Sequence, residues 1–389
     1  MLKRRTAMVA VPLALLALAA RVTGSRGGET LDRRAAAGPR VARDGAAGAP
    51  PRVPGRAGRA PRAGFGIQYW GEAYTAAALA QAPHATLIVE ASVAGAEGAE
   101  GRERRFTAAE VAAIRREGAR PVYAYLNVGE LEANRDYWVE AFGDAADPGI
   151  PREASPAWHA GRGPGGEWLA AFWTPEWAAV LERRIDAFLA RGYDGVFLDD
   201  VLHYYTWSMP GVVVPARLAA RPGAPGCAGD FAAAMMGLVV RLAAHARATA
   251  ALRDADFAVL VNGGAYIGWD AATTGGAAPT APHPGLEGYL AAIDGIAIES
   301  ALADPAQQGT VDALRHGFRA HGIPVLAIDY LSRYPGADPA SFRTRIAERA
   351  GTAGFLPYVA DDERFARLDP PLLPRKDEGP AIERSAEPR

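Results

Sequence analysis

The chain has 389 residues, 49% of them apolar and 22% charged, which is the composition of a folded protein with one large domain. Its lysines, Lys3 and Lys376, stand near the two ends, so Schiff-base chemistry and a P-loop lysine are excluded for the folded part. Cys227 is the single cysteine, which excludes an internal disulfide, a thiolate zinc cluster and a CxxC redox pair.

The charge is unevenly distributed. Residues 1–63 carry 13 Lys/Arg and 3 Asp/Glu, which leaves 29 and 41, a formal charge of −12, for residues 64–389. Nucleic-acid binding depends on Lys and Arg that neutralise phosphates, so an acidic domain disfavours it. We expect a neutral or cationic ligand and no nucleic-acid partner.

The N-terminal residues 1–20 begin with three basic residues, continue in an apolar run, and place Ala17 and Ala19 as in an A-x-A cleavage site. They predict a signal peptide and a secreted or periplasmic protein. The run is shorter than the roughly 20 apolar residues of a membrane span, so we expect none in the mature form, with an uncleaved anchor as the alternative. Residues 21–63 predict a disordered basic linker, and residues 370–389 a disordered tail.

Between these ends, eight short apolar runs rich in strand-forming residues alternate with stretches of helical period. The predicted strands are Phe65–Trp70, Thr86–Ala91, Pro121–Val128, Gly195–Asp200, Ala258–Asn262, Gly295–Glu299, Val325–Tyr330 and Gly354–Val359. The clearest helix follows the cap Thr174 and Pro175, with Trp177 on its buried face. Further helices are predicted over Ala108–Glu117, Phe231–Ala251, Val311–Ala320 and Pro339–Ala350.

This alternation predicts an α/β fold, a (β/α)8 TIM barrel over residues 64–369. The alternative is an open doubly wound sheet, which calls for a Gly-rich phosphate-binding turn after the first strand. The first strand here, in GFGIQYWGE, is followed by no G-x-G-x-x-G. The barrel is therefore favoured, and we expect a monomer.

In a barrel the active site forms where the strands end. Nearly every predicted strand ends in a carboxylate, an amide or an aromatic residue. These expected substrate-binding residues are Gln68, Trp70, Glu90, Tyr125, Asn127, Glu130, Asp200, Asn262, Asp329 and Tyr330, with Tyr204 just beyond the fourth strand. So many acids at one rim would cost several kcal/mol each if they were buried unpaired, and they point to function.

Asp199 and Glu299 are the predicted catalytic pair. Each follows an apolar strand core, and the two strands lie two apart in barrel order, so both carboxylates reach the mouth of one pocket. Two carboxylates flanking a bond, with aromatic rings and amides around them, are typical of glycoside hydrolysis. Asp200 is an alternative nucleophile.

Other chemistries fit less well. Asp200 and His203 suggest a metal site, but the seven histidines show no H-x-x-H or H-E-x-x-H spacing, so no metal and no cofactor is predicted. No G-x-S-x-G elbow is present for a serine hydrolase. Asp194 precedes the fourth strand and predicts a structural turn, whereas Glu130 and Arg135 could form an ion pair or contact sugar.

Seven segments, in the same order over about residues 64–360, resemble glycoside hydrolase family 114, the endo-α-1,4-polygalactosaminidases. They are YLNVGE from Tyr125, RDYW from Arg135, WTPEW from Trp173, GYDGVFLDD from Gly192, VNGG from Val261, IAIES from Ile296 and VLAIDY from Val325. The resemblance implies a secreted (β/α)8 enzyme without a metal that cleaves α-1,4-linked galactosamine-containing polysaccharide with retention. It places the nucleophile at Asp199 and the acid/base at Glu299.

The sequence departs from the family pattern at several points. Glu90 stands where the family usually has an aspartate, and Leu202 where it commonly has a second acid. The loops 202–229 and 264–288 are long and rich in Gly and Pro. A hydrolase of a different glycan and a carbohydrate-binding barrel without turnover therefore stay open as alternatives.

Overall fold

The computed structural model describes residues 60–374 except 72, 98–102, 144–148, 150–153 and 274–277. The predicted signal peptide, most of the linker and most of the tail lie outside these residues. Eight parallel strands form one sheet. They are β1 (Phe65–Gln68), β2 (Thr86–Val89), β5 (Val122–Asn127), β9 (Gly195–Asp199), β10 (Ala258–Asn262), β11 (Gly295–Glu299), β12 (Val325–Tyr330) and β13 (Leu356–Ala360).

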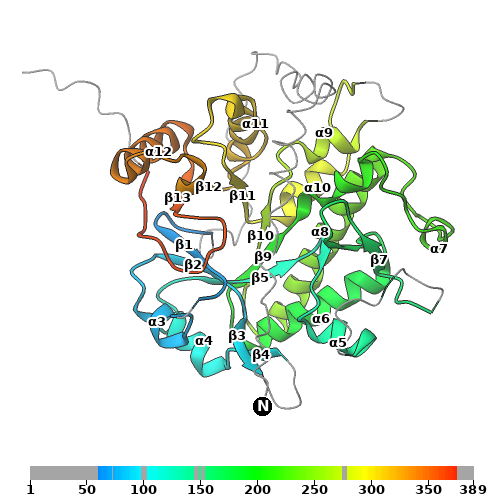
Figure 1. The fold of residues 1–389 in the computed structure, drawn as a ribbon, viewed down its shortest axis with the longest axis horizontal. Coiled ribbons are helices and arrows are strands. Elements are labelled where there is room, and N and C mark those ends of the chain that lie inside the picture. The colour runs from blue at the N-terminus through cyan, green and yellow to red at the C-terminus, as the bar shows by residue number, and fades with distance from the viewer. Residues whose placement is uncertain are drawn as a thin grey trace, which may run out of the picture.

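The strands pair in chain order, and the sheet curves until its first and last members are neighbours (Figure 1). Beyond β1, the Tyr69 amide donates to the carbonyl of Phe365 (2.9 Å), and the Tyr358 hydroxyl of β13 donates to Ile67 of β1 (3.4 Å). The fold is thus a nearly closed (β/α)8 barrel, which confirms the predicted class and all eight strands.

Helices flank this barrel on its outside (Figure 1). They are α3 (Ala76–Gln81), α4 (Ala108–Ile114), α5 (Asp136–Phe142), α6 (Pro175–Arg191), α7 (Ala216–Ala219), α8 (Ala228–Ala251), α9 (Ile267–Ala271), α10 (Leu286–Ala292), α11 (Gln308–Gly317) and α12 (Pro339–Ala353). Short 3₁₀ turns include η3 (Val201–Tyr204) and η4 (Thr206–Ser208). The apolar helix α8 is long enough to cross a membrane, but it packs against α6, α9 and α10 as a barrel helix.

Local sequence explains where the best-defined helices begin and end. The Thr174 hydroxyl accepts the Trp177 amide at the start of α6, Pro175 is its first residue, and Gly192 ends it in the left-handed conformation. The helix α4 ends earlier than predicted because Arg116 and Glu117 have positive φ angles of 50° and 53°.

Short antiparallel pieces interrupt the barrel and were not expected from sequence. A hairpin of β3 (Ser92–Glu97) and β4 (Glu103–Arg105) follows β2. A three-stranded sheet of β6 (Glu130–Leu131), β7 (His159–Arg162) and β8 (Trp168–Ala170) follows β5. Two- to six-residue strands carry too short a period to stand out in a sequence.

The core has two layers. Alternate strand residues fill the barrel interior, and the others pack against the helices, as Trp177 does from α6 with none of its surface exposed. The folded part also extends past its predicted limits. The Arg62 amide donates to Thr86 Oγ1 (3.0 Å), and Leu372 packs against the outer core layer.

Candidate active site

A row of polar and aromatic side chains lies inside the barrel, where its strands end. Strand residues alternate between two faces, and the interior face of β9 runs Gly195, Phe197, Asp199. The same alternation brings one polar or aromatic side chain inward near the end of almost every strand. This row consists of Tyr69, Glu90, Tyr125, Asn127, Asp199, Asn262, Glu299 and Tyr330.

Asp199 and Glu299 are joined through one amide. Asn262 Nδ2 donates to Asp199 Oδ1 (2.8 Å) and to Glu299 Oε1 (2.8 Å). Both oxygens lie 2.8 Å from the same nitrogen, so they are no more than about 5.6 Å apart, close enough for the two carboxyl groups to act on one glycosidic bond, one as nucleophile and the other as proton donor. The structure brings the predicted catalytic pair together in one site.

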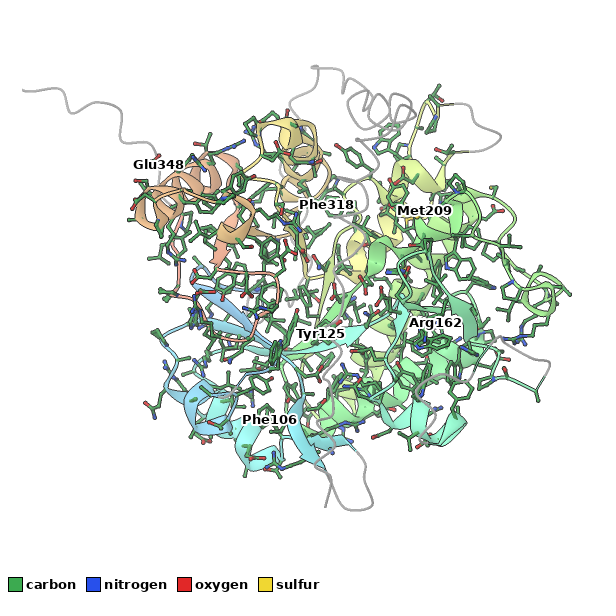
Figure 2. All side chains as sticks on the ribbon, in the orientation of Figure 1. Phe106, Tyr125, Arg162, Met209, Phe318 and Glu348 are labelled. Carbon is green, nitrogen blue, oxygen red and sulfur yellow. The ribbon has the colours of Figure 1, made fainter. Side chains whose placement is uncertain are left out.

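Neutral donors surround these carboxylates. The Tyr330 hydroxyl donates to Glu299 Oε2 (2.7 Å), and the Asp200 amide donates to Asp199 Oδ1 (2.9 Å). Tyr125 hydrogen-bonds Asp199 and packs on Tyr69 with ring centroids 4.6 Å apart. Tyr125 is labelled in Figure 2 near the middle of the molecule.

The surroundings of the site raise the pKa values of its acidic groups. Burial, followed by the charge of Asp200, raises the pKa of Asp199 to about 7. Burial and then the charge of Asp199 raise the pKa of Glu299. Burial together with the nearby Asp199 and Glu299 keeps the pKa of Tyr69 well above its usual range, so this phenol stays protonated. Perturbed carboxyls gathered in one place are the pattern of a catalytic centre.

The backbone is strained beside both predicted catalytic carboxylates. Asp200 follows Asp199 with φ 59°, and Ser300 follows Glu299 with φ 57°, both in the left-handed region that non-glycine residues avoid. Such conformations cost of order 1 kcal/mol each and concentrate at functional sites. Each strand therefore ends directly at the carboxylate that it contributes to the polar row.

Next to Asp199 lies a cluster of four side chains, Asn127, Glu130, Asp200 and His203, which we call the flanking cluster. Asn127 Nδ2 donates to Asp200 Oδ2, and His203 Nε2 lies 3.0 Å from Glu130 Oε1. In the structure Arg135 pairs with Glu90 and Glu132, and Glu130 faces His203.

Several predicted substrate-binding residues have their polar groups occupied by protein. Glu90 accepts from Ser92 N and Oγ and from Arg135, and Gln68 donates to the carbonyls of Trp70 and Ala366. The Trp70 indole donates to the carbonyl of Arg364 (2.7 Å), although its ring keeps some exposure.

Tyr204 and Asp329 are almost fully buried. The Tyr204 hydroxyl donates to Asp270 (2.7 Å), whereas Asp329 accepts the Ala303 amide (2.7 Å) on the outer face of β12. In this structure neither side chain reaches the solvent from which a substrate would enter. Tyr204 and Asp329 are therefore outside the proposed substrate site.

Sequence reasoning missed three residues of this region. Tyr69 was passed over between Gln68 and Trp70, although strict alternation from Phe65 and Ile67 points it inward. His203 was weighed only as a metal ligand, and Asp270 lies in the short helix α9, within a segment that the sequence predicts as a loop. A pocket of about 410 Å³ is lined by Arg162, Trp207 and Val213, and no residue of the polar row lines it. Figure 2 labels Arg162 at some distance from Tyr125.

Comparison with known proteins identifies the family of this chain. The sequence pattern of glycoside-hydrolase family GH114 matches residues 59–272, more than half of the chain. The protein belongs to this family and is a glycoside hydrolase.

Relatives share the fold over most of their length. Uncharacterised proteins of Deinococcus radiodurans and Thermotoga maritima are 28% and 25% identical, over 66% and 70% of this chain and 68% and 73% of their own. Aspergillus fumigatus Ega3, solved in complex with galactosamine, has a similar barrel with a TM-score of 0.51 and 15% identity, covering 80% of this chain and 96% of Ega3.

Proposed function

We propose that this glycoside hydrolase cleaves, from within the chain, polysaccharide with α-1,4-linked galactosamine or N-acetylgalactosamine, and that it retains the anomeric configuration. The observation that carries the proposal is the Asn262 amide shared by Asp199 and Glu299. Carboxyl groups about 5–5.5 Å apart are typical of retaining enzymes, and about 6.5–9.5 Å of inverting ones. The shared amide supports the shorter separation.

The surroundings of the two carboxyl groups support this assignment of roles. Asp199 receives donors from Asn262, the Asp200 amide and Tyr125, which favour its ionised form and suit a nucleophile. Once Asp199 is ionised, its charge raises the pKa of Glu299, which keeps the acid protonated beside it. One carboxylate and one carboxylic acid then face the same bond.

In the first step, Asp199 attacks the anomeric carbon while Glu299 gives its proton to the leaving oxygen, which forms a glycosyl-enzyme and releases one product. In the second step, Glu299 takes a proton from water, and the water oxygen displaces Asp199 from the sugar. The Asn262 amide and the Tyr330 hydroxyl hold Glu299 in place through both steps.

Charge supports a cationic substrate. The formal charge of residues 64–389 is −12, and Asp199, Asp200 and Glu299 lie together at the strand ends without an Arg or Lys in hydrogen-bond contact among the described residues. A partly deacetylated galactosamine polymer carries ammonium groups that such a field attracts. The galactosamine bound to Ega3 is in line with this substrate class.

The same proposal includes export. The basic and apolar residues 1–20 have the pattern of a secretory signal, and a polymer substrate lies outside the cell. Expression of the full chain in a bacterial host, followed by N-terminal sequencing of the exported protein, should find a new terminus after Ala19 or nearby. Retention of Met1 in the membrane fraction would instead support an uncleaved anchor.

The deciding experiment incubates the full chain with α-1,4-galactosamine polymer of graded acetylation, beside a neutral α-glucan, and follows released oligosaccharides by mass spectrometry. We expect release from the aminosugar polymer alone, as a ladder of internal fragments. Asp199→Asn and Glu299→Gln should abolish release.

Two matched variants control for nonspecific effects. Asp186→Asn and Glu182→Gln make the same chemical changes on the outer helix α6, where these acids pair with His245 and Arg241. Both should release oligosaccharide at the unmodified rate. Release from the α-glucan would contradict the proposed substrate, and binding without release would contradict turnover.

A further inference from the structure

A pocket outside the polar row takes no part in the two-carboxylate mechanism. It has a volume of about 410 Å³ and lies between the hairpin of β7 and β8 and the loop 202–229. Arg162, Gly163 and Leu169 line it from the hairpin, and Trp207 and Val213 line it from the loop. Pockets that bind small molecules measure roughly 300–1,000 Å³. This pocket, which we call the side pocket, is within that range.

The side pocket lies at the same end of the barrel as the polar row. The hairpin follows β5 and the loop follows β9, and in a barrel both segments emerge at the C-terminal face of the strands. Leu169 pairs with Glu130 of β6, and Trp207 follows Asp199 by eight positions. The segments that form the side pocket therefore adjoin the catalytic residues.

Aromatic contacts hold the lining of the side pocket in place. The Trp207 ring stacks on Phe231 of α8 with ring centroids 5.7 Å apart, and it packs edge-on against Trp173 (4.9 Å). On the hairpin, the Arg162 guanidinium lies over the Trp168 ring, 3.9 Å from its centroid. Side chains that are positioned before a ligand arrives lose little entropy when it binds.

The charge of the side pocket is opposite to that of the polar row. Arg162 is the only charged residue among those that line the pocket, and Glu167 lies close to Gly163 without lining it. The polar row instead contains Asp199 and Glu299. An ammonium group is therefore attracted to the row and repelled by the side pocket.

The side pocket combines hydrogen-bond donors with apolar surface. Besides the Arg162 guanidinium, it has the backbone amides of Gly211 and Val213, which donate to no acceptor within the part of the chain that the structure describes. Val212 and Val213 add apolar side chains, and Val213 is 79% exposed. An acetamido group matches this lining, because its carbonyl oxygen accepts hydrogen bonds and its methyl group packs on apolar carbon.

We propose that the side pocket is a subsite for an N-acetylated galactosamine unit of the substrate chain, away from the bond that is cleaved. The inference rests on the proposed function, because it requires the same polymer in the catalytic site. The acetamido oxygen accepts from Arg162, and the methyl group contacts Val212 and Val213. The enzyme thereby selects chains that carry an acetylated unit at a fixed distance from the cleaved bond.

The first test measures binding and needs no turnover. Methyl N-acetyl-α-galactosaminide and methyl α-galactosaminide are titrated separately into the full chain, and the indole ¹H–¹⁵N signal of Trp207 is followed by NMR. Loss of one of the eight tryptophan signals in Trp207→Phe assigns it. The acetylated sugar should bind about 10-fold more tightly than the amine, because it accepts a hydrogen bond from Arg162 and carries no charge to be repelled.

Two variants of the side pocket should change this preference. Arg162→Glu replaces the cation by an anion, so the amine should become the tighter ligand. Val213→Asp adds an anion at an exposed position where the fold tolerates it, and it should reduce the preference for the acetylated sugar by about 5-fold. The control is Arg253→Glu, an exposed charge reversal just after α8, which should keep the wild-type preference.

The second test sequences the oligosaccharides that the wild type releases from partly acetylated polymer. Tandem mass spectrometry distinguishes acetylated from free amine units by their mass. An acetylated unit should be enriched at one fixed distance from the new chain ends. Arg162→Glu should lose this enrichment, and Arg253→Glu should keep it.

The outcomes separate the subsite from the proposed function. If the wild type releases no oligosaccharide, the proposed function fails, and the NMR titrations still decide which sugar the side pocket binds. Equal binding of the two sugars, an unchanged preference in Arg162→Glu, or acetylated units at random positions in the products would each overturn the subsite. Tighter binding of methyl α-galacturonide than of the acetylated sugar would also overturn it, in favour of a site for acidic sugars.

Discussion

Two carboxylates stand at opposite ends of the strand β9. Asp194, just before the strand, accepts two hydrogen bonds from Arg115 (2.8 and 2.6 Å) and one from the Val122 amide (3.0 Å). Asp199, at the other end, is held by an amide side chain, a phenol and a backbone amide. A guanidinium partner satisfies and fixes a carboxylate, whereas neutral donors orient it and leave it free to react.

The difference follows from the direction in which the strands run through the barrel. Residues at the N-terminal face of the strands serve stability, and those at the C-terminal face serve chemistry. Asp194 links the end of α4 to the start of two strands, and Asp199 shares the Asn262 amide with Glu299. Substitutions at the two ends of β9 should therefore affect different properties of the protein.

The largest expected effect is on turnover. Asp199→Asn removes the nucleophile and Glu299→Gln the proton donor, so kcat/KM on the aminosugar polymer should fall by roughly 10⁴-fold or more. Asp194→Asn, at the other end of the strand, should keep kcat within about 3-fold when it is assayed well below its unfolding temperature. Equal losses of activity in all three variants would contradict the proposed difference between the two ends of β9.

The next effect is on stability. Asp194→Ala leaves the Arg115 guanidinium and the Val122 amide without this partner, which should lower the free energy of unfolding by about 2 kcal/mol. Urea unfolding followed by tryptophan fluorescence measures it. Arg115→Ala should cost a similar amount and should add little in the double variant, because both changes break one interaction. Fully additive losses would show that the pair does not act as a unit.

The pH dependence tests the state of the reactive end. Since the pKa of Asp199 is raised to about 7 and this group must be ionised, the acidic limb of kcat/KM should fall near neutral pH, well above the ordinary carboxyl range. Activity should rise as the pH climbs through that limb and fall again where Glu299 loses its proton. An acidic limb near pH 4 would show that Asp199 is an ordinary, well-solvated carboxylate.

A smaller effect concerns the stability that the folded protein loses when the buried Asp199 ionises. Because the folded-state pKa of Asp199 is raised, its ionisation weakens the folded protein as the pH rises from the unfolded-state value of about 4 toward 7. Asp199→Asn should therefore stabilise the protein at pH 8 and do so much less at pH 4, where the carboxyl is protonated in the folded state. Thermal unfolding at the two pH values measures this difference, and destabilisation at pH 8 would contradict it.

The barrel could be predicted from sequence because its eight strands are buried apolar runs of four to six residues, separated by amphipathic helices. Asp199 and Glu299 could be chosen because each ends such a run. Choosing every polar residue near a strand end ignored the alternation that sends Asp329 outward and Tyr69 inward.

Long-range partners were also beyond the sequence. Glu90 is bound by Arg135, 45 positions away, and Tyr204 by Asp270, 66 positions away. A single sequence does not show which distant charges meet, so Glu130 was assigned a possible pairing with Arg135 while it faces His203. These distant residues come together only in the folded barrel.

Trapping of the glycosyl-enzyme tests the central claim most directly. The substrate is an aryl α-galactosaminide with a good leaving group, which reacts with Asp199 without a proton donor. In Glu299→Gln the second step is slow, because no base takes the proton from the attacking water. The covalent glycosyl-enzyme should therefore accumulate. Peptide mapping by mass spectrometry should place one sugar on Asp199. An adduct on Asp200, or no adduct with a product of inverted configuration, would contradict the account.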